Sequence, residues 1–578
     1  MEIVTLKIND KEIQVPKGTT VLEAARSIGI KIPSLCYLKD VNKCSACRIC
    51  VVEVGSKLIA SCSLEAEEGM VVKTNTPAVR EVRRMVVELL LSNHKRECTT
   101  CIRNENCELQ SCAKELNVRE IKYEGERISK PLDLSSTSIV RDAEKCILCG
   151  RCISTCSDVQ TVYAIGFAKR GFNTKVEAPY DKGIGNTVCI NCGQCIMACP
   201  VGALSEKNNV DDVWKVLGER DKYVIVQTAP AVRVALGEEF GIKIGSRVTG
   251  KMVSALRNLG FYKVFDTDFA ADLTIMEEGT ELLSRLEREE NLPLMTSCCP
   301  GWIKFVEHFY PEMLNNLSTC KSPHEMEGAL IKTYFAEMMG IDAKKIVVVS
   351  IMPCVAKKFE RQRQELSNND MQDVDYVLTT RELAQMIKEA GIDFVNLEDE
   401  DFDNPLGEST GASVIFGATG GVAEAALRTI YEITGDKELD NIDFEVVRGI
   451  NGIRIAEIEL QNGKKVTAAV AHGLGNAREL LRIVKSGEMK IDFIEVMACP
   501  GGCVTGGGQP ILNSNDLAII NAKCERAGAI YEEDKEMPIR KSHKNPYILK
   551  VYKEFLGKPN GYLSHELLHT HYVKRDKF

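Results

Sequence analysis

Hydrophobic and polar positions alternate along the start of the chain. Apolar side chains recur at nearly every second position over residues 3–15, and an Asn-Asp pair interrupts the alternation. This pattern predicts a β-hairpin. A threonine at position 19 or 20 can cap a following helix over residues 21–28, and apolar residues at helical spacing predict a further helix over 79–93.

The second half of the chain alternates strand-like apolar runs with amphipathic segments. Residues 223–227 and 346–351 are apolar runs of strand length. We expect a helix that reaches Glu239 after the first run, and a helix around residues 356–366 after the second. A further helix is expected to run from Thr274. This alternation predicts an α/β layer structure.

Composition places the chain among ordinary globular proteins. Hydrophobic residues make up 44% and charged residues 27% of the 578 residues, which excludes disordered, collagenous and coiled-coil chains. No apolar run approaches the roughly 18 residues that span a bilayer, and residues 1–10 lack a signal-peptide pattern. We therefore expect a cytoplasmic protein without membrane contact. The net charge of −9 disfavours a nucleic-acid partner.

The cysteine count changes this picture. The chain has 24 cysteines and only 8 histidines, and 17 of the cysteines lie before residue 200. Cytosolic thiols stay reduced, so closely spaced cysteines indicate metal rather than disulfides.

Two cysteine runs repeat the spacing C-x2-C-x2-C-x3-C, which is the bacterial two-cluster ferredoxin pattern. Zinc is the alternative, but zinc ribbons use pairs of cysteines. In the ferredoxin pattern the fourth ligand of each 4Fe-4S cluster comes from the other run. One cluster is expected to use Cys146, Cys149, Cys152 and Cys199, and the other Cys189, Cys192, Cys195 and Cys156.

Two further modules precede this repeat. The flank of Cys47 and Cys50 resembles the 2Fe-2S domain of respiratory complex I and related oxidoreductases, with zinc as the alternative. A histidine-led group with H-x3-C-x2-C-x5-C spacing resembles a 4Fe-4S site of the same enzymes, and its neutral imidazole should raise the cluster potential. The two expected ligand sets are Cys36, Cys47, Cys50 and Cys62, and then His94, Cys98, Cys101 and Cys107.

Three cysteine-bearing segments stand out in the second half, at residues 296–302, 352–360 and 495–503. They supply four thiolates, enough for one more 4Fe-4S cluster, from Cys299, Cys354, Cys499 and Cys503. The segments closely resemble the three signatures of iron-only (FeFe) hydrogenases. The resemblance implies that Cys503 bridges to a diiron subsite with CO, cyanide and azadithiolate ligands, the two units together forming the H-cluster. We expect the glycines at 501–502 and 506–508 to let the backbone approach this bulky group.

The resemblance also implies a route for protons. Cys298 is left without a cluster role and, in the family, its thiol passes protons to the azadithiolate amine. Glu278, Glu281 and Arg285 stand at i, i+3 and i+7 of the expected helix and therefore share one of its faces. The implied path continues from Cys298 through Glu278, Ser318 and Glu281 to Arg285 and solvent. Alone, glutamates on a helix would indicate only a solvated face.

Further residues are implied to surround the diiron unit. Lys357 is expected to contact a cyanide ligand, and the pocket wall is expected to include Pro230, Met352, Met497 and Gly417. The chain departs from some family members at Ala231, where a serine can stand, and at His324, where a glutamine can stand. No role is assigned to the remaining cysteines, Cys44, Cys112, Cys320 and Cys524.

These observations predict a multidomain α+β protein. Its expected parts are a β-grasp 2Fe-2S ferredoxin-like domain at 1–78, a small one-His/three-Cys 4Fe-4S domain at 79–125, a two-cluster ferredoxin domain at 126–209, a large two-lobed α/β catalytic domain at 210–535, and a small-subunit-like wrapping segment at 536–578.

The resemblance implies a hydrogenase that interconverts protons, electrons and H2, with ferredoxin or another redox protein as electron partner and with maturation proteins as further partners. A catalytic subunit of an NADH-linked or electron-bifurcating complex is an alternative. NADH would then bind partner flavoprotein subunits, because no G-x-G-x-x-G fingerprint follows a strand. Two more protein classes stay open: a non-catalytic sensor or iron–sulfur assembly factor, and a molybdopterin enzyme with the same front modules.

Overall fold

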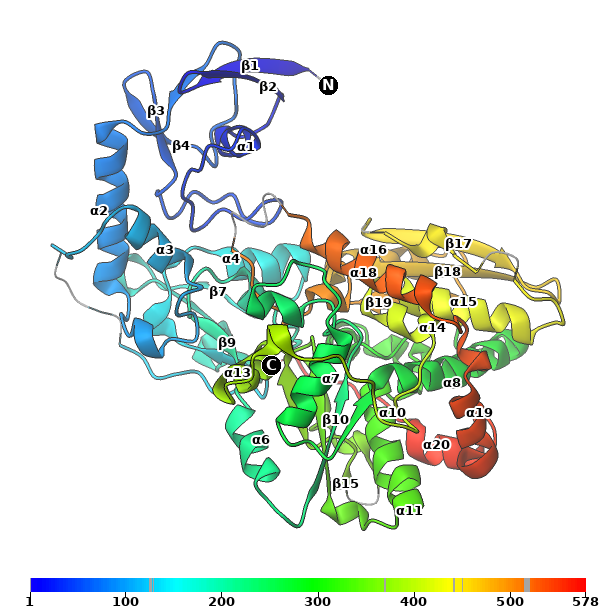
Figure 1. Ribbon diagram of the computed structural model, residues 1–578. Coiled ribbons are helices and arrows are strands. Elements are labelled where there is room, and N and C mark those ends of the chain that lie inside the picture. Colours follow the sequence, from blue (N-terminus) through cyan, green and yellow to red (C-terminus); the bar gives the residue numbers. More distant parts are fainter. Residues whose placement is uncertain are drawn as a thin grey trace. The chain divides into compact units, whose positions relative to one another are not determined.

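The computed structural model describes residues 2–577 apart from 124–126, 128, 369–370, 440–441, 450 and 514–519. The chain forms two compact units of mixed helices and strands (Figure 1). The first unit comprises residues 1–189, 194–205 and 511–521, and the second comprises 190–193, 206–510 and 522–578. The predicted mixed, multidomain architecture is confirmed. Within the described part of the chain, no helix is long and apolar enough to cross a membrane.

The predicted N-terminal hairpin is present in the first unit. Strands β1 (Ile3–Ile8) and β2 (Lys11–Pro16) pair antiparallel, and the Thr20 side chain caps helix α1 (Val21–Ser27). They belong to a five-stranded sheet of order β2-β1-β5-β3-β4. Its other strands are β3 (Val51–Val54), β4 (Lys57–Ala60) and β5 (Val71–Lys73).

The rest of the first unit consists of short elements that hold cysteine-bearing loops. Helix α2 begins at a proline, two residues before the predicted start, and ends directly before His94. The elements are α2 (Pro77–Asn93), α3 (Glu108–Glu115), β6 (Ile139–Arg141), α4 (Arg151–Ser154), β7 (Gly166–Ala168), β8 (Lys175–Glu177) and α5 (Gln194–Ala198).

The second unit contains two four-stranded sheets. One is wholly parallel, with order β11-β10-β13-β16. The other has order β12-β19-β18-β17 and is parallel except for the β17–β18 hairpin. The strands of the first sheet are β10 (Tyr223–Thr228), β11 (Lys263–Asp266), β13 (Ile346–Met352) and β16 (Tyr376–Thr379). Those of the second are β12 (Leu294–Met295), β17 (Ile453–Glu459), β18 (Lys465–His472) and β19 (Phe493–Met497).

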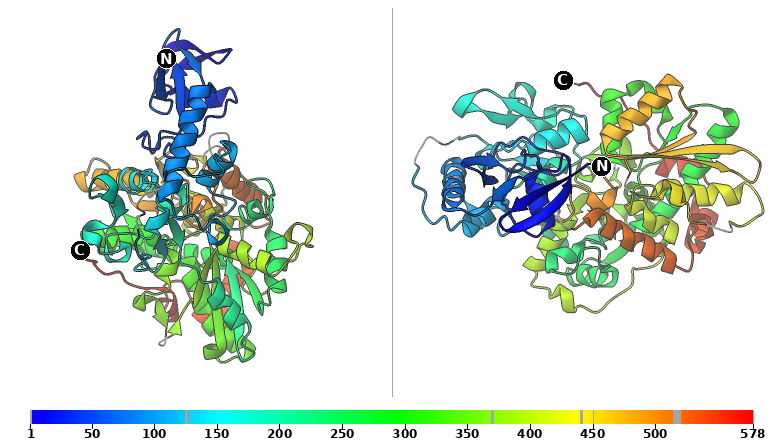
Figure 2. Two further views of the ribbon diagram at one scale, coloured as in Figure 1. Left: turned by 90° about the vertical axis from the view of Figure 1, so that its left-hand side faces the viewer. Right: turned by 90° about the horizontal axis from the view of Figure 1, so that it is seen from above.

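Helices cover both faces of the second sheet. Figures 1 and 2 show helix α16 (Leu474–Ser486) on one face and helix α15 (Gly421–Ile433) on the other. Helix α8 (Thr267–Arg288) packs against α15 and against α10 (Pro323–Leu330). The α/β layering predicted from the alternating pattern is therefore present.

Three predicted helix boundaries are wrong. After β10 the chain makes turns and only a short 3-10 helix, Leu236–Phe240. After β13 the helix is the single turn α12 (Lys357–Glu360). In both places the chain first turns across the end of its strand. Helix α8 begins at Thr267 rather than Thr274, because the Asp266 side chain caps it there.

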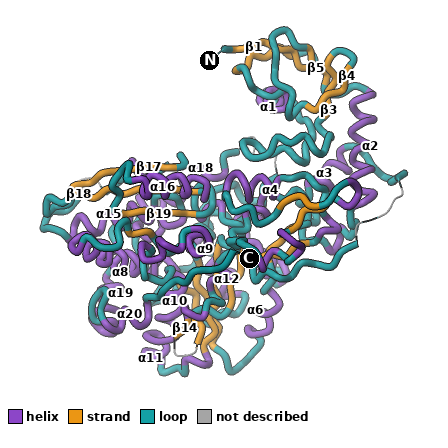
Figure 3. The backbone as a smooth tube through the Cα atoms, turned by 180° about the vertical axis from the view of Figure 1, so that it is seen from behind, coloured by secondary structure: helices purple, strands orange, loops and turns teal. Residues whose placement is uncertain are grey.

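The C-terminal segment packs along α8. It follows α18 (Ala522–Glu536) and contains α19 (Pro546–Val551) and α20 (Tyr562–Leu568). The Asn545 amide donates to Asp272 of α8 at 3.0 Å, and residues 552 and 564 donate to Glu277 of the same helix. Figure 3 shows α19 and α20 beside α8 and α10.

Candidate functional site

The carboxyl ends of four strands meet around one cavity in the second unit. The loops that leave β10, β12, β13 and β19 line a space of about 90 Å³. Parallel sheets place binding sites at these ends. The sequence-predicted residues that line the cavity are Pro230, Cys298, Cys299, Met352, Cys354, Lys357, Gly417, Met497, Cys499 and Cys503. Segments far apart in the sequence therefore converge as the motif order predicts.

Four thiols crowd one side of this cavity. Burial, followed by the nearby Cys299, raises the pKa of Cys354 to about 12. Burial and the neighbouring Cys354 raise the pKa of Cys499, and the same two influences raise that of Cys503. All four are free cysteines. Four thiolates this close repel one another unless a cation lies among them, so the donor set fits an iron–sulfur cluster.

The glycines beside these thiols serve packing more than the cavity. Only Gly502 and Gly506 of the five line it. A Cβ on Gly506 would lie 2.1 Å from the Pro353 carbonyl oxygen, and one on Gly507 would lie 2.5 Å from the Cys192 carbonyl oxygen. The expectation that all five make room for an inorganic group is wrong, since the neighbouring atoms at positions 507 and 508 are protein.

Cys298 lies between the cavity and a buried carboxyl group. Burial and then the charge of Glu278 raise the pKa of the Cys298 thiol well above its usual range, so the thiol is protonated at neutral pH. Burial, followed by the charge of Glu281, raises the pKa of Glu278 to about 8. The Glu278 Oε1 atom has no hydrogen-bond partner in the described part of the chain. Glu278 can therefore hold or release a proton near neutral pH.

Ser318 and Arg285 complete the predicted group around Glu281. The Ser318 hydroxyl donates to Glu281 Oε2 at 2.8 Å, and the Arg285 guanidinium donates to Oε1 at 2.6 Å. The spacing along α8 thus places both glutamates and the arginine on one face, as predicted.

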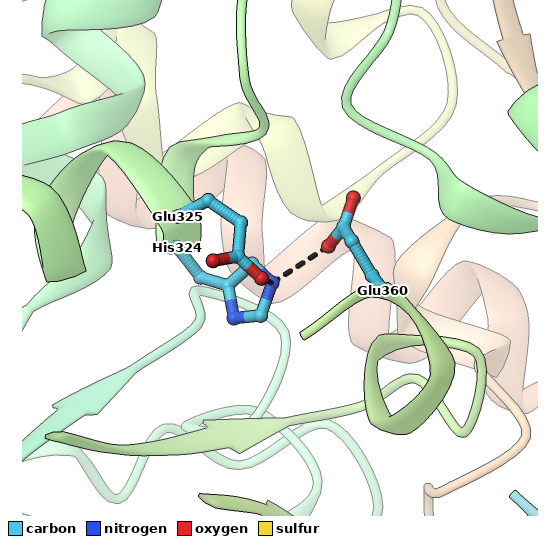
Figure 4. A group of neighbouring side chains, drawn as sticks. All are labelled: His324, Glu325 and Glu360. Atoms are coloured by element: carbon cyan, nitrogen blue, oxygen red, sulfur yellow. Dashed lines mark hydrogen bonds and ion pairs between the residues drawn. The ribbon is translucent and has the colours of Figure 1, made fainter. Parts of the chain in front are cut away.

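Lys357 belongs to a buried charge network that sequence reasoning missed. Its ammonium donates to Glu360 at 2.6 Å and to the Cys298 carbonyl at 3.2 Å. His324 Nε2 lies 2.6 Å from the same Glu360 oxygen and 3.1 Å from Glu325 (Figure 4). Burial would raise the pKa of Glu360, but Lys357 and His324 lower it to about 2. With an ammonium already bound, this trio is a charge network and not a cation site.

A signal for this network existed in the sequence. Lys357 and Glu360 stand at i and i+3, which brings two helical side chains together. The departure at His324 also has a structural result, because His324 lines the cavity and its ring reaches Glu360. Ala231 lines the cavity without a polar side chain.

In the first unit, the four cysteines of the first module converge. All four are buried. A hydrogen bond with Cys47 lowers the pKa of Cys36, but a hydrogen bond with Cys62 and burial together raise it to about 11. A hydrogen bond with Cys62 lowers the pKa of Cys50. Cys44 is exposed, and its thiol donates to the Cys149 carbonyl at 3.4 Å. It is not one of the four expected ligands.

His94 is suited to bind iron. Burial lowers its pKa to about 4, so the ring stays neutral, and its Nδ1 has no hydrogen-bond partner within the described residues. Lys145 interacts with His94, and both Lys145 and the Cys101 sulfur lie against Gly202. Burial raises the pKa of Cys107, and the nearby Cys101 raises it further. Cys98 is exposed.

The paired runs interleave as the ferredoxin pattern predicts. One small cavity is lined by Cys146, Cys149, Cys152 and Cys199, and so draws its fourth cysteine from the second run. Burial and then the neighbouring Cys189 raise the pKa of Cys156, again across the two runs. Residues 190–193 group with the second unit, where Cys192 lies against Gly507 and raises the pKa of Cys499.

Two other unassigned cysteines lie near these sites, since Cys112 lines a cavity with Cys107 and the Cys320 N–H donates to the Ser318 hydroxyl. Cys112 and Cys320 are buried, and burial raises the pKa of Cys112 to about 12. Cys524 is exposed on α18.

Family models match five stretches of the chain. Residues 2–77 match a 2Fe-2S iron-sulfur cluster binding domain, 83–122 the NADH-ubiquinone oxidoreductase-G iron-sulfur binding region, and 145–203 a 4Fe-4S dicluster domain. Residues 222–507 match the C-terminal domain of the iron only hydrogenase large subunit, and 521–575 match the iron hydrogenase small subunit.

Similar proteins cover the full chain. It is 51% identical to the NADP-reducing hydrogenase subunit HndD of Solidesulfovibrio fructosivorans, over 100% of both chains. It is 44% identical to iron hydrogenase 1 of Clostridium pasteurianum, over 99% of this chain and 100% of that protein. Among solved structures, an apo form of the FeFe-hydrogenase HydA1 from Chlamydomonas reinhardtii is 41% identical with a TM-score of 0.57, covering 64% of this chain and 99% of that chain.

Proposed function

The chain belongs to the iron-only hydrogenase family and is an oxidoreductase that acts on H2, and from this premise we propose how its own residues perform the reaction. The observation that carries the proposal is the convergence of three cysteine segments, Lys357 and the Cys298–Glu278 pair on one cavity. The reaction interconverts two protons and two electrons with H2.

The cavity residues hold and shield the H-cluster. Cys299, Cys354, Cys499 and Cys503 are the proposed ligands of its 4Fe-4S part, with Cys503 shared with the diiron part. When bound, this group supplies the iron at which H2 forms or splits. The apolar walls, among them Pro230, Met352 and Met497, exclude water, which strengthens electrostatic interactions inside. The Lys357 ammonium supplies positive charge where cyanide ligands would lie.

The proton moves along the chain's own acids and bases. The Cys298 thiol donates its proton at the cavity, and Glu278 restores it. Glu278 in turn regains its proton from Glu281 through the Ser318 hydroxyl, which is hydrogen-bonded to Glu281. A carboxyl group with a pKa of about 8 is matched to this exchange near neutral pH. Arg285 holds the Glu281 carboxylate in position.

Electrons reach the cavity through the accessory clusters. We propose one 2Fe-2S cluster and three 4Fe-4S clusters, held by the ligand sets of the first three modules. Cys192 supports a path of electron entry, because it lies against Gly507 and acts on Cys499. The finer fold assignments, a β-grasp first domain and a two-cluster ferredoxin fold, belong to the same proposal, as does a cytoplasmic location.

Replacing His94 with cysteine should lower the potential of one accessory cluster. A thiolate adds negative charge where the neutral imidazole adds none, so the shift is expected to be on the order of 100 mV downwards. A redox titration followed by electron paramagnetic resonance measures it. Cys112→Ala is the control, since Cys112 is buried but is no proposed ligand. Unchanged potentials in His94→Cys would contradict ligation by His94.

Redox partner subunits are a second aspect of the proposal. The full-length similarity to a subunit of an NADP-reducing hydrogenase makes an assembly with partner subunits a second candidate. An NADH- or NADPH-oxidising flavoprotein would suit the accessory clusters, and ferredoxin is the simpler electron partner. Purification from the native host tests this. Flavin-containing proteins should co-elute with the chain, and elution as a single polypeptide would favour ferredoxin.

Hydrogen evolution from reduced methyl viologen tests the function itself. The chain matured with its diiron site should evolve H2. A fully loaded chain without activity would instead favour a sensor or an iron–sulfur assembly factor.

A further inference from the structure

The outer end of the proton route needs a group that can take up and release a proton, and Arg285 is not one. Its guanidinium donates to the carbonyls of Asn291 and Asn315 at 3.0 Å, to the Leu317 carbonyl at 2.9 Å and to Glu281. A guanidinium stays protonated in proteins and has no acceptor. Arg285 therefore fixes Glu281 and does not itself deliver the proton. The Glu281 side chain is 11% exposed, and its carboxylate has a second contact.

A second contact leads from Glu281 to a histidine. The Thr319 hydroxyl lies 3.4 Å from Glu281 Oε1 and 2.8 Å from His569 Nδ1. A hydroxyl both accepts and donates, so it can pass a proton between the two groups. The His569 side chain is only 4% exposed, and the exposed His565 ring stacks on it at 4.2 Å between centroids.

The C-terminal segment holds His569 in this position. Thr570 N–H donates to the Thr319 carbonyl at 2.7 Å, and Lys321 N–H donates to the Leu568 carbonyl at 2.8 Å. The far side of the ring, Nε2, faces Glu277 Oε2 at 3.2 Å. Backbone pairing and a carboxylate thus fix the ring so that Nδ1 points at Thr319.

Glu277 supplies a negative charge next to the His569 ring. Burial would raise its pKa, but hydrogen bonds from His569, Ser564 and Tyr552 lower it. The group therefore stays a carboxylate, and its negative charge lies beside the ring. The titratable groups around His569 are Glu277 of α8 and His565 of α20, which contact the ring, and Glu281, which is reached through Thr319. Tyr552 donates to Glu277, and Cys320 pairs with His569 through a backbone β-bridge.

We propose that Thr319 and His569 form the outer relay of the proton route, through which Glu281 exchanges protons with solvent. This inference rests on the proposed function. During H2 evolution the His569 Nδ1–H bond breaks and its proton passes to the Thr319 oxygen. The threonine's own proton passes to a Glu281 oxygen, which leaves a neutral imidazole and a carboxylic acid. A proton from solvent then returns to Nδ1, which restores the imidazolium. H2 oxidation runs the same steps backwards.

A pair of threonine variants tests the relay. Thr319→Val removes the hydroxyl with little change in shape and leaves the His569–Glu277 contact in place. Its rate of H2 evolution should fall about a hundredfold, at the lower end of the range for a lost proton-transfer group. Thr319→Ser keeps the hydroxyl and should retain the rate. His569→Gln should lose as much as Thr319→Val and recover with added imidazole.

His543→Gln is the matched control. His543 also lies between a threonine and a glutamate, Thr429 and Glu432, but its contacts do not lead to Glu281. Iron content and the infrared bands of the bound cofactor check loading in every variant. Loss in Thr319→Val and His569→Gln, but not in Thr319→Ser and His543→Gln, supports the relay. Wild-type rates in Thr319→Val and His569→Gln would overturn the relay. An inactive Glu281→Gln would then leave the proposed proton route standing, whereas an active Glu281→Gln would overturn that route as well.

Discussion

Cys298→Ala should abolish H2 turnover while every cluster remains bound. Cys298 faces the cavity but is not a proposed ligand, and the buried Glu278 stands behind it. The methyl group of alanine cannot carry a proton, so we expect a loss of about a thousandfold or more in both directions of the reaction. Cys298→Ser keeps the shape, but its hydroxyl is far less acidic, so it should lose nearly as much. Dye-linked assays of H2 evolution and uptake measure the effect.

Cys524→Ser is the control for this loss, because that thiol is exposed on α18 and has no role in the proposed chemistry. Iron analysis must show equal loading in all three variants. Retained turnover in a fully loaded Cys298→Ala protein would contradict the proton role of this thiol.

Glu278→Gln should lower turnover by about a hundredfold to a thousandfold. The amide keeps the size of the side chain but cannot release a proton to Cys298 or accept one from it. The wild type should also show the titration of this group. Because its pKa is raised to about 8, the acid form is present below that pH, and H2 evolution should decline as the pH rises through about 8. H2 oxidation needs the carboxylate and should rise over the same interval.

The pH-rate profile distinguishes this role from a structural one. The decline near pH 8 should disappear from the residual activity of Glu278→Gln. Glu327→Gln is the matched control: Glu327 is equally buried, its carboxyl oxygens have no hydrogen-bond partner among the described residues, and burial raises its pKa. It lies on α10, away from the route. An unchanged rate and profile in Glu278→Gln would contradict the route.

Local spacing made much of the site predictable. Ligands on one loop are fixed by short separations, so the two ferredoxin runs predict their ligands before the fold is known. Glu278, Glu281 and Arg285 share a helix face because of their spacing alone, and the structure places them together around Ser318. The N-terminal hairpin and the cap at Thr20 follow equally from local pattern.

Contacts between distant segments were not predictable. Thr319 and His569 are 250 positions apart, and no local pattern connects them. The glycines at 507 and 508 carried a misleading signal, since a close approach of backbone to protein leaves the same trace in the sequence as an approach to a cofactor. The helices after β10 and β13 are shorter than their amphipathic patterns suggest, because the chain first turns across the cavity.

Infrared spectroscopy of the matured protein tests the central claim most directly. The account predicts sharp CO and cyanide stretching bands, in a spectral region where protein does not absorb, and predicts that Cys503→Ser loses them while the accessory clusters remain. Those bands should shift when H2 is added. A protein that evolves H2 with full iron content but shows no such bands, or whose bands survive unchanged in Cys503→Ser, would contradict the assignment of the cavity as the H-cluster site.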